Sequence, residues 1–461
     1  MLNYLWLALV TLAVLIGGAT GRLADVTSGA FQMADTAVMK IALPLAGIMA
    51  LWLGVMRLAE RSGLVQQLAR ALRAPMRWLF PEVPADHPAM GSMLMNMAAN
   101  MLGLANAATP LGLRAMRDLE SLNKFPGTAT NAMCTFLAIN TSSIQLLPTT
   151  AIAILAAQHS KDPTAIVGTA LLATICSTVA GIAAVKWLQR WPLFRIQPAA
   201  AGTAAAGSAA PAPAPDTESL AEPAPLTRWG RAALGLLLAV FAALFLWIVA
   251  APAGYHSATA ALHARIFPVQ VALPAWEDAS AQHIALRAIG TLSLLAVPGL
   301  LVFFPLYAAL RGVKVYEEFV EGAKEGFSVA LRVIPFLVAI LVAIGMFRGA
   351  GGIEALKSLL APLLTPLGFP PDLLPMVLVR PLSGSATTGL FTELVQRLGP
   401  DSLITRMAGT IYGSTETTFY VIAVYFGAVG IRRARHAVAA GLFADFIGVV
   451  ASVAICRLMF G

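Results

Sequence analysis

The chain has 461 residues, of which 58% are hydrophobic and only 12% are charged. A soluble globular protein carries about 25% charged residues, and each domain of a chain this long would need a polar shell. The 31 Lys and Arg and the 23 Asp and Glu residues are too few to form such shells. The composition therefore excludes a soluble globular protein and indicates one that lies in a lipid bilayer.

The net charge of +8 does not indicate a nucleic-acid partner. A nucleic-acid-binding surface would combine basic patches with interleaved aromatic residues, whereas here the basic residues form short clusters between apolar runs. Cys134, Cys176 and Cys456 lie inside apolar runs without CxxC spacing. We therefore expect neither a disulfide framework nor a zinc site.

Long runs with few or no charges recur along the chain, and a helix needs about 20 apolar residues to cross the hydrocarbon core. The runs cover residues 2–21, 41–56, 125–160, 163–185, 232–264, 288–310, 333–347, 407–431 and 437–456. We interpret them as about nine transmembrane helices. The sequence thus predicts an all-α polytopic membrane protein.

Lys and Arg residues in short loops favour the cytoplasmic side of a membrane. Residues 57–77, 186–195 and 432–435 form three basic clusters, and placing all three inside gives a topology without conflict. Residues 199–227 are rich in Ala and Pro, with an alternating Ala-Pro run at 210–215. Such a composition behaves as a semi-extended tether, so we expect a cytoplasmic linker between two halves.

The two halves resemble each other in order. The segment from Leu43-Pro44 to Arg57 matches the segment from Ile334-Pro335 to Arg348 at a constant offset of 334 − 43 = 291. The loop that follows is rich in arginine in the first copy and nearly neutral in the second, so one copy is inverted relative to the other. Inverted repeats are typical of alternating-access transporters, which bind substrate at the repeat interface.

Each half then contains a polar-rich apolar segment that we expect to form a re-entrant helical hairpin. Residues 88–113 carry no charge but hold three Asn residues, a Thr and Pro110, and residues 380–389 have the same small polar character. Backbone that bends at membrane depth must be buried in protein or line a cavity, and Gly103 and Pro110 would bend it here. Two ordinary helices packed through small residues are the alternative.

A span interrupted by polar residues follows each hairpin, at residues 140–143 and 412–418. Hydroxyl groups or unwound backbone at such breaks coordinate Na⁺ or a polar solute in transporters. The alternative is that these hydroxyls donate to carbonyl oxygens one turn earlier. The predicted substrate-binding residues are Asn96, Asn100, Asn106, Thr109, Asn140, Thr141, Ser142, Ser143, Arg380, Ser383, Ser385, Thr387, Thr388, Ser414, Thr415, Glu416, Thr417 and Thr418.

Two acidic residues are candidates for ion coupling, and Glu416 is the stronger one. An ionised carboxylate at mid-membrane costs about 2.5 kcal/mol or more, so Glu416 should face a cavity and be paired, protonated or bound to an ion. Arg380 is its candidate partner. Asp445, in the last span, is equally well explained as a hydrogen-bonding residue between helices. Glu393, at the exit of the second hairpin, is expected at the membrane interface.

Residues 315–327 place Val315, Phe319, Ala323 and Phe327 on one helical face, with glutamates elsewhere. This pattern predicts an interfacial amphipathic helix. An acidic face of this kind also suits a contact with a partner subunit.

The sequence contains no HExxH, GxSxG or P-loop pattern, and its six histidines lie in loops or at the ends of spans. We therefore expect a protein that is not an enzyme and has no cofactor, with bound Na⁺ as the one exception. The sequence leaves open whether any other metal binds.

The motifs resemble those of a known family. NMAANMLGLANAATPLG at 96–112, preceded by ALWLG at 50–54, resembles spore maturation protein A of bacteria. FVEGAKEGF at 319–327, RPLSGS at 380–385 and GSTETTFY at 413–420 resemble spore maturation protein B. Both groups carry the nucleoside-recognition or Gate domain, which is similar to the core of concentrative nucleoside transporters.

The resemblance implies a fusion of two Gate-type halves, residues 1–196 and 228–461, joined by the linker at 197–227. It also implies that the first hairpin and residues 140–143 line one side of a site, and that the second hairpin and residues 414–418 line the other. The sequence shows no evident residue for stacking on a base. Phe136, Phe419 and Tyr420 are the nearest options.

We expect an inner-membrane secondary transporter of a small polar or anionic organic solute, either nucleoside-like or a carboxylate. It would work by alternating access, coupled to H⁺ through Glu416 or to Na⁺ through the polar breaks. The alternative is a non-transporting membrane scaffold or regulatory protein that acts through Gate-domain interfaces. The expected partners are the solute, the lipid bilayer and further copies of the chain in a homo-oligomer, without nucleic acid.

Overall fold

A computed structural model describes residues 2–142, 145–194, 224–266, 282–364 and 368–461. Within these ranges the chain forms helices and loops, and the only β-type pairing is one isolated bridge between Thr128 and Arg433. Most of the predicted linker, residues 195–223, lies outside the described residues. The expected all-α membrane fold is confirmed.

The elements before the linker are α1 (Leu2–Ala19), α2 (Leu23–Asp35), the π-helical segment η1 (Thr36–Ala42), α3 (Leu43–Arg61), α4 (Leu64–Ala71), α5 (Arg73–Leu79), α6 (Pro88–Met101), α7 (Ala105–Glu120), α8 (Asn131–Thr141), α9 (Thr149–Ala157), α10 (Ile166–Leu188) and the 3-10 turn η2 (Pro192–Phe194). The elements after it are α11 (Arg228–Ala250), α12 (Pro252–Ile266), α13 (Ile284–Leu310), α14 (Val315–Gly349), α15 (Gly352–Leu364), the 3-10 turn η4 (Pro371–Leu373), α16 (Leu374–Val379), α17 (Gly384–Leu398), α18 (Leu403–Ser414), α19 (Thr418–Gly427) and α20 (Ala437–Phe460).

Each of the nine apolar runs contains helix in the described residues, but the runs do not form nine equal spans. Six helical stretches in the described ranges are long and apolar enough to cross a membrane: Leu23–Arg61, Ile166–Leu188, Arg228–Ala250, Ile284–Leu310, Val315–Gly349 and Ala437–Phe460. The runs at 125–160 and 407–431 are each divided into two shorter helices, α8 with α9 and α18 with α19. The divisions fall at the polar residues where the sequence predicts broken spans.

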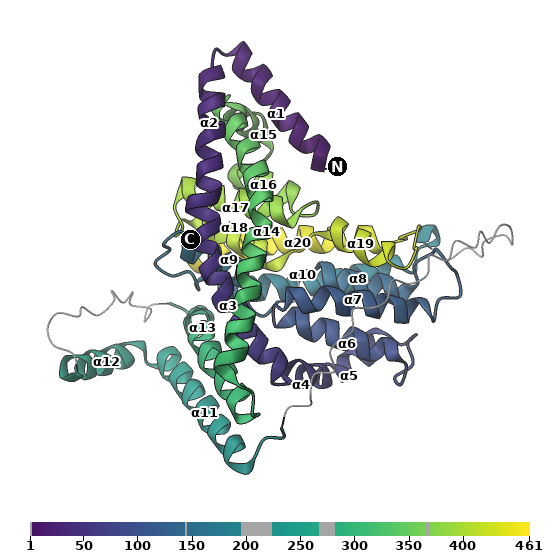
Figure 1. The fold of residues 1–461 in the computed structure, drawn as a ribbon, viewed down its shortest axis with the longest axis vertical. Helices are drawn as coiled ribbons and strands as arrows, with labels where there is room; N and C mark the ends of the chain where they lie inside the picture. Colours follow the sequence, from purple (N-terminus) through teal and green to yellow (C-terminus); the bar gives the residue numbers. More distant parts are fainter. Residues whose placement is uncertain (1, 143–144, 195–223, 267–281, 365–367) are drawn as a thin grey trace.

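The two halves pack into one body. In Figure 1 the long helices α2–α3 and α14 run side by side along the long axis, although they are distant in sequence. Helix α10 packs against α18 and α20, which again joins the first half to the second. A single apolar core contains buried side chains of both halves, among them Met56, Phe136, Phe391 and Ile411.

Glycines allow α14 to lie directly on α2 and α3. They form two GxxxG pairs, Gly322 with Gly326 and Gly345 with Gly349. A Cβ atom added at Gly326 would lie 2.6 Å from the Cα atom of Ala50, and one at Gly345 would lie 2.6 Å from the carbonyl oxygen of Gly29. Small residues that let backbones approach closely are the usual means of packing helices in a membrane.

The segment predicted as a separate interfacial helix is instead the first part of α14. Residues 315–327 continue without interruption into the apolar run at 333–347. A Cβ added at Gly54 of α3 would lie 2.7 Å from the Phe319 ring, and Glu318 and Glu325 form ion pairs with Arg57 at 2.8 and 2.7 Å. Phe319 of the apolar face therefore contacts α3, whereas Phe327 is exposed. The sequence alone could not distinguish contact with a helix from contact with a membrane surface.

We expect Gly326→Leu to destabilise the contact between α3 and α14. The added side chain overlaps backbone atoms of α3, and overpacking of this kind costs about 1–3 kcal/mol or more. The effect would be measured as a lower unfolding temperature of the purified protein in detergent. Gly290→Leu on α13 is the matched control, because a Cβ there meets nothing within 4 Å. Equal unfolding temperatures for the two variants would contradict this packing.

Candidate functional site

Both predicted hairpins are present as pairs of packed helices, α6 with α7 and α16 with α17. Gly103 forms the turn between α6 and α7 with a φ of +75°, a conformation that favours glycine. Pro110 lies inside α7, which continues through it. Each arm is shorter than the roughly 20 residues needed to cross the hydrocarbon core, which fits re-entrant hairpins.

Each hairpin tip is joined by a main-chain hydrogen bond to the broken helix of its own half. The Leu146 N–H donates to the Met101 carbonyl oxygen at 3.0 Å, and the Phe419 N–H donates to the Pro381 carbonyl oxygen at 2.9 Å. Met101 ends α6 and Pro381 lies in the turn after α16, whereas Leu146 precedes α9 and Phe419 lies in the first turn of α19. Each hairpin tip is thus linked to the chain at the break of its own half.

Arg380 holds the break between α18 and α19. Its side chain is only 4% exposed. Its Nε donates to Thr415 Oγ1 at 3.2 Å, and one Nη donates to the carbonyl oxygens of Tyr412, at 2.9 Å, and of Thr415. The guanidinium also lies 4.5 Å from the centroid of the Tyr412 ring. A buried cation therefore satisfies carbonyls that the end of α18 leaves without helical partners.

A polar cavity of about 570 Å³ lies where the hairpins and breaks of both halves meet. Seven of the predicted site residues line it: Asn100, Thr109, Asn140, Ser383, Ser385, Glu416 and Thr417. Three of these come from the first half and four from the second, as the resemblance implies. Their role in binding stays a prediction.

Asparagines of the first half form one edge of the cavity. The Asn100 amide donates to Asn140 Oδ1 at 2.9 Å, which links the first hairpin to the first broken helix. Asn96 is fully buried behind it and donates to the Ala108 carbonyl oxygen at 2.7 Å, across the hairpin. Asn100 and Asn140 thus face the cavity, while Asn96 fastens the two arms together.

Glu416 is the only acidic residue among the residues that line this cavity. Its side chain is 32% exposed, and Oε1 lies 4.0 Å from an Nη atom of Arg380. The N–H of Thr417 donates to its Oε2 at 3.1 Å. The expected pairing with Arg380 is therefore present at long range, and the carboxylate remains open to the cavity.

Most hydroxyl groups at the breaks point into the protein. Thr141 donates to the Ala138 carbonyl oxygen at 3.0 Å, Ser142 to that of Ile139 at 2.8 Å, and Thr415 to that of Ile411 at 2.7 Å. Thr387, Thr388 and Ser414 make the same kind of contact with an earlier turn. For Thr141, Ser142, Ser414 and Thr415, the four of these residues at the breaks, the alternative stated from the sequence describes the observed geometry.

Asp445 and Thr418 meet behind the cavity. The Thr418 hydroxyl donates to Asp445 Oδ2 at 2.6 Å, and both residues are buried. Neither residue lines the cavity. Ser143 and the side chain of Asn106 lie outside the described residues. Groups of three or more His, Cys, Asp or Glu residues that could hold a metal ion are absent from the described part of the chain.

Several lining residues are missing from the sequence prediction. Phe336 of α14, Tyr425 of α19 and Gln145 also line the cavity, and so does Tyr420, which the sequence offered only as an option for stacking. Thr417, Tyr420, Val421, Val424 and Tyr425 share one face of α19, and this helical spacing is a signal that the sequence contained. Phe336 and Gln145 carry no comparable signal, because their position depends on how the two halves pack.

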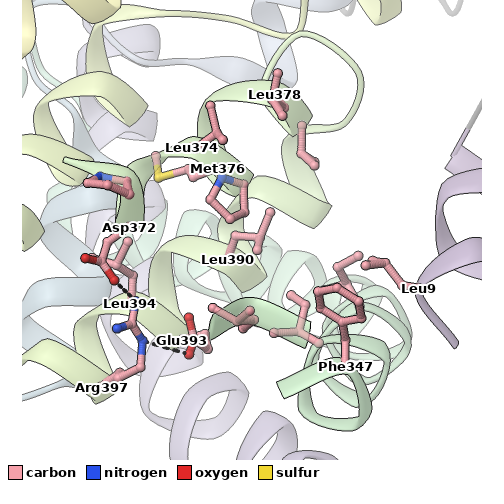
Figure 2. Close-up of a pocket in the computed structure, with 16 residues that line it drawn as sticks. Leu9, Phe347, Asp372, Leu374, Met376, Leu378, Leu390, Glu393, Leu394 and Arg397 are labelled. Atoms are coloured by element: carbon pink, nitrogen blue, oxygen red, sulfur yellow. Dashed lines mark hydrogen bonds and ion pairs between the residues drawn. The ribbon is translucent and has the colours of Figure 1, made fainter. Parts of the chain in front are cut away.

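A second pocket, shown in Figure 2, lies between α14, α16 and α17 and shares no lining residue with the polar cavity. Its wall is mostly apolar, and its polar end contains Asp372, Glu393 and Arg397. Glu393 is 5% exposed and pairs with Arg348 at 3.1 Å and with Arg397 at 3.3 Å. Glu393 is therefore a buried ion-pair residue, and its expected position at the membrane interface stays a prediction.

Comparison with known proteins identifies related sequences in both halves. The sequence model of a family named Gate and described as nucleoside recognition matches residues 42–158 and 330–432. Spore maturation protein B of Bacillus subtilis (strain 168) is 46% identical over 176 residues, which are 38% of this chain and 99% of that protein. Spore maturation protein A of the same organism is 44% identical over 182 residues, which are 40% of this chain and 92% of that protein.

Among solved structures, the Alcanivorax borkumensis YdaH transporter aligns over 99% of this chain and 96% of its own. The TM-score is 0.42 and the sequence identity is 15%.

We expect Arg380→Lys to destabilise the broken helix. A lysine ammonium cannot donate from one rigid plane to both Thr415 and Tyr412, and hydrogen bonds from charged groups contribute about 1.5–3 kcal/mol each. The unfolding temperature in detergent should fall, whereas exposed Arg432→Lys, the matched control, should leave it unchanged. A variant as stable as the wild type would show that Arg380 does not hold the break.

Proposed function

Since the chain belongs to the family of spore maturation proteins A and B, which carry the nucleoside-recognition Gate domain, we propose that it is a secondary transporter of the bacterial inner membrane. Its substrate is a small polar organic solute, nucleoside-like or a carboxylate. The observation that carries the proposal is the polar cavity formed jointly by the hairpins and broken helices of the two halves.

The size of the cavity and the spread of its lining support a small-molecule ligand. A volume of about 570 Å³ lies within the usual range for small-molecule sites. A protein that acted only as a scaffold would have no need for such a cavity between its hairpins. The cavity therefore favours transport over the scaffold alternative.

The chemistry of the wall suits a ligand with an aromatic part and several hydrogen-bonding groups. Asn100, Asn140 and Gln145 offer amides, and Phe336, Tyr420 and Tyr425 offer aromatic surface. The N-terminus of α17, at Gly384 and Ser385, adds main-chain N–H groups and a partial positive charge. Within the two solute classes, the amides and the aromatic rings support the nucleoside-like one, whereas the N-terminus of α17 also suits a carboxylate.

Glu416 is the proposed coupling residue. It is the one carboxylate in the wall of the cavity, and its contact with Arg380 is long enough for the carboxylate to exchange a proton or meet a cation of the solute. Asp445 is already bonded to Thr418 and lies behind the wall, so it belongs to the support of the site. The unwound segments beside Glu416 allow the local movement that alternating access requires.

We expect Glu416→Gln to abolish gradient-driven uptake. Removing the carboxylate leaves the cavity without a group that can carry the coupled proton. The measurement is uptake of radiolabelled uridine, with radiolabelled succinate as the carboxylate probe, into proteoliposomes under an imposed pH or Na⁺ gradient.

Exposed Glu354→Gln on α15 is the control and should transport like the wild type. Uptake by Glu416→Gln at the wild-type rate would contradict the coupling role. Wild-type vesicles that take up neither probe above the level of protein-free vesicles, under either gradient, would contradict the proposed substrate classes.

A further inference from the structure

A further cavity, of about 500 Å³, lies on the side of the first hairpin tip away from the polar cavity and is distinct from the pocket in Figure 2. All of its lining side chains are apolar, and they come from α3, α10, α11, α13 and the first hairpin and break. Helices α11 and α13 lie outside the regions that match the Gate family. The cavity is therefore a seam between an added helix pair and the body of the repeat, as the position of α11 and α13 in Figure 1 indicates.

The hairpin tip separates the two cavities. Asn100 and Gln145 line the polar cavity, whereas the adjacent residues Met101 and Leu146 line the apolar one. Met101 and Leu146 are themselves joined by the hydrogen bond between the tip and the break. A molecule in the apolar cavity thus lies directly against the element that forms one wall of the polar site.

The apolar cavity follows two helices that are long enough to span the membrane. Its wall runs from Leu237 to Phe245 on α11 and from Leu292 to Phe304 on α13, which is about 12–18 Å at 1.5 Å per residue. Half of the hydrocarbon core is about 15 Å thick. The length of the cavity and the lack of polar lining groups therefore match an acyl chain.

Basic residues lie beyond the end of the cavity that is formed by Leu237 of α11 and Phe304 of α13. A Cβ added at Gly230 would lie 3.6 Å from Leu310, so the start of α11 and the end of α13 lie together. Arg228 and Arg231 are exposed there, and Arg311 follows the last residue of α13. These cations lie one to three helical turns beyond the apolar wall, where a lipid headgroup would be.

We propose that this cavity binds the acyl chain of an anionic phospholipid, with its headgroup beside Arg228, Arg231 and Arg311 and its tail against the first hairpin tip. The lipid occupies the seam between the added helix pair and the repeat and supports the tip from its apolar side. The basic end selects the headgroup by charge, and the apolar wall selects the chain by shape alone.

Photolabelling of the full-length protein tests the proposal. The probe is phosphatidylglycerol with a diazirine in one acyl chain, in vesicles that hold the purified protein, and phosphatidylcholine with the same chain is the comparison. We expect label on Phe241, Leu292 and Met101, and about tenfold less label there from phosphatidylcholine, the loss expected when roughly two charge contacts of about 0.7 kcal/mol are absent.

Two variants separate the tail from the headgroup. Ala296→Phe fills part of the cavity and should reduce label at all three positions about tenfold. This is the loss of affinity expected when roughly two CH₂ groups of the acyl chain are no longer buried. Leu236→Phe, on the exposed face of α11, is the matched control and should leave the label unchanged. The double variant Arg228→Gln, Arg231→Gln should reduce phosphatidylglycerol labelling severalfold, towards the phosphatidylcholine level.

Three results would overturn the proposal. The first is label that is spread evenly over the exposed residues of α11. The second is equal labelling of the wild-type protein by the two lipids. The third is a crosslink from Phe241 to a second copy of the chain. None of these measurements depends on uptake, so their outcome is independent of the transport experiment.

Discussion

A chain that breaks its helices inside a membrane must satisfy the exposed backbone groups from within, because no water is available there to do so. In this protein Arg380 meets that requirement for α18, through the carbonyl oxygens of Tyr412 and Thr415. The main-chain hydrogen bonds from Leu146 to Met101 and from Phe419 to Pro381 satisfy backbone groups of the adjoining segments. The cavity exists because these contacts allow both unwound segments to persist.

The polar cavity draws its wall from both halves of the chain. Each hairpin belongs with the break of its own half, yet the cavity wall needs both, from Asn100 and Asn140 on one side to Ser383 and Glu416 on the other. The long helices α3 and α14, packed through glycines, hold the halves in register. A rigid glycine-packed pair beside two unwound segments is an arrangement in which local movement can occur without loss of the core.

At the first hairpin tip and in the break beside it, a polar residue is followed directly by an apolar one. Asn100 and Gln145 line the polar cavity, while Met101 and Leu146 line the apolar cavity beside α11 and α13. Any movement of the tip therefore changes both cavities at once. The added helix pair, which the Gate match does not include, thus contacts the site through a shared element.

The sequence by itself determined the membrane setting, the repeat, the hairpins and the breaks, because these depend on local composition and order. Residues 415–417 interrupt a helix where the polar run predicts it, and Asn100, Asn140 and Glu416 face the cavity. Only the tertiary structure decided which polar side chains turn inward. Thr141, Ser142 and Thr415 bond to their own helices, and Phe336 reaches the cavity from α14, because side-chain direction and contact between halves depend on packing across several hundred residues.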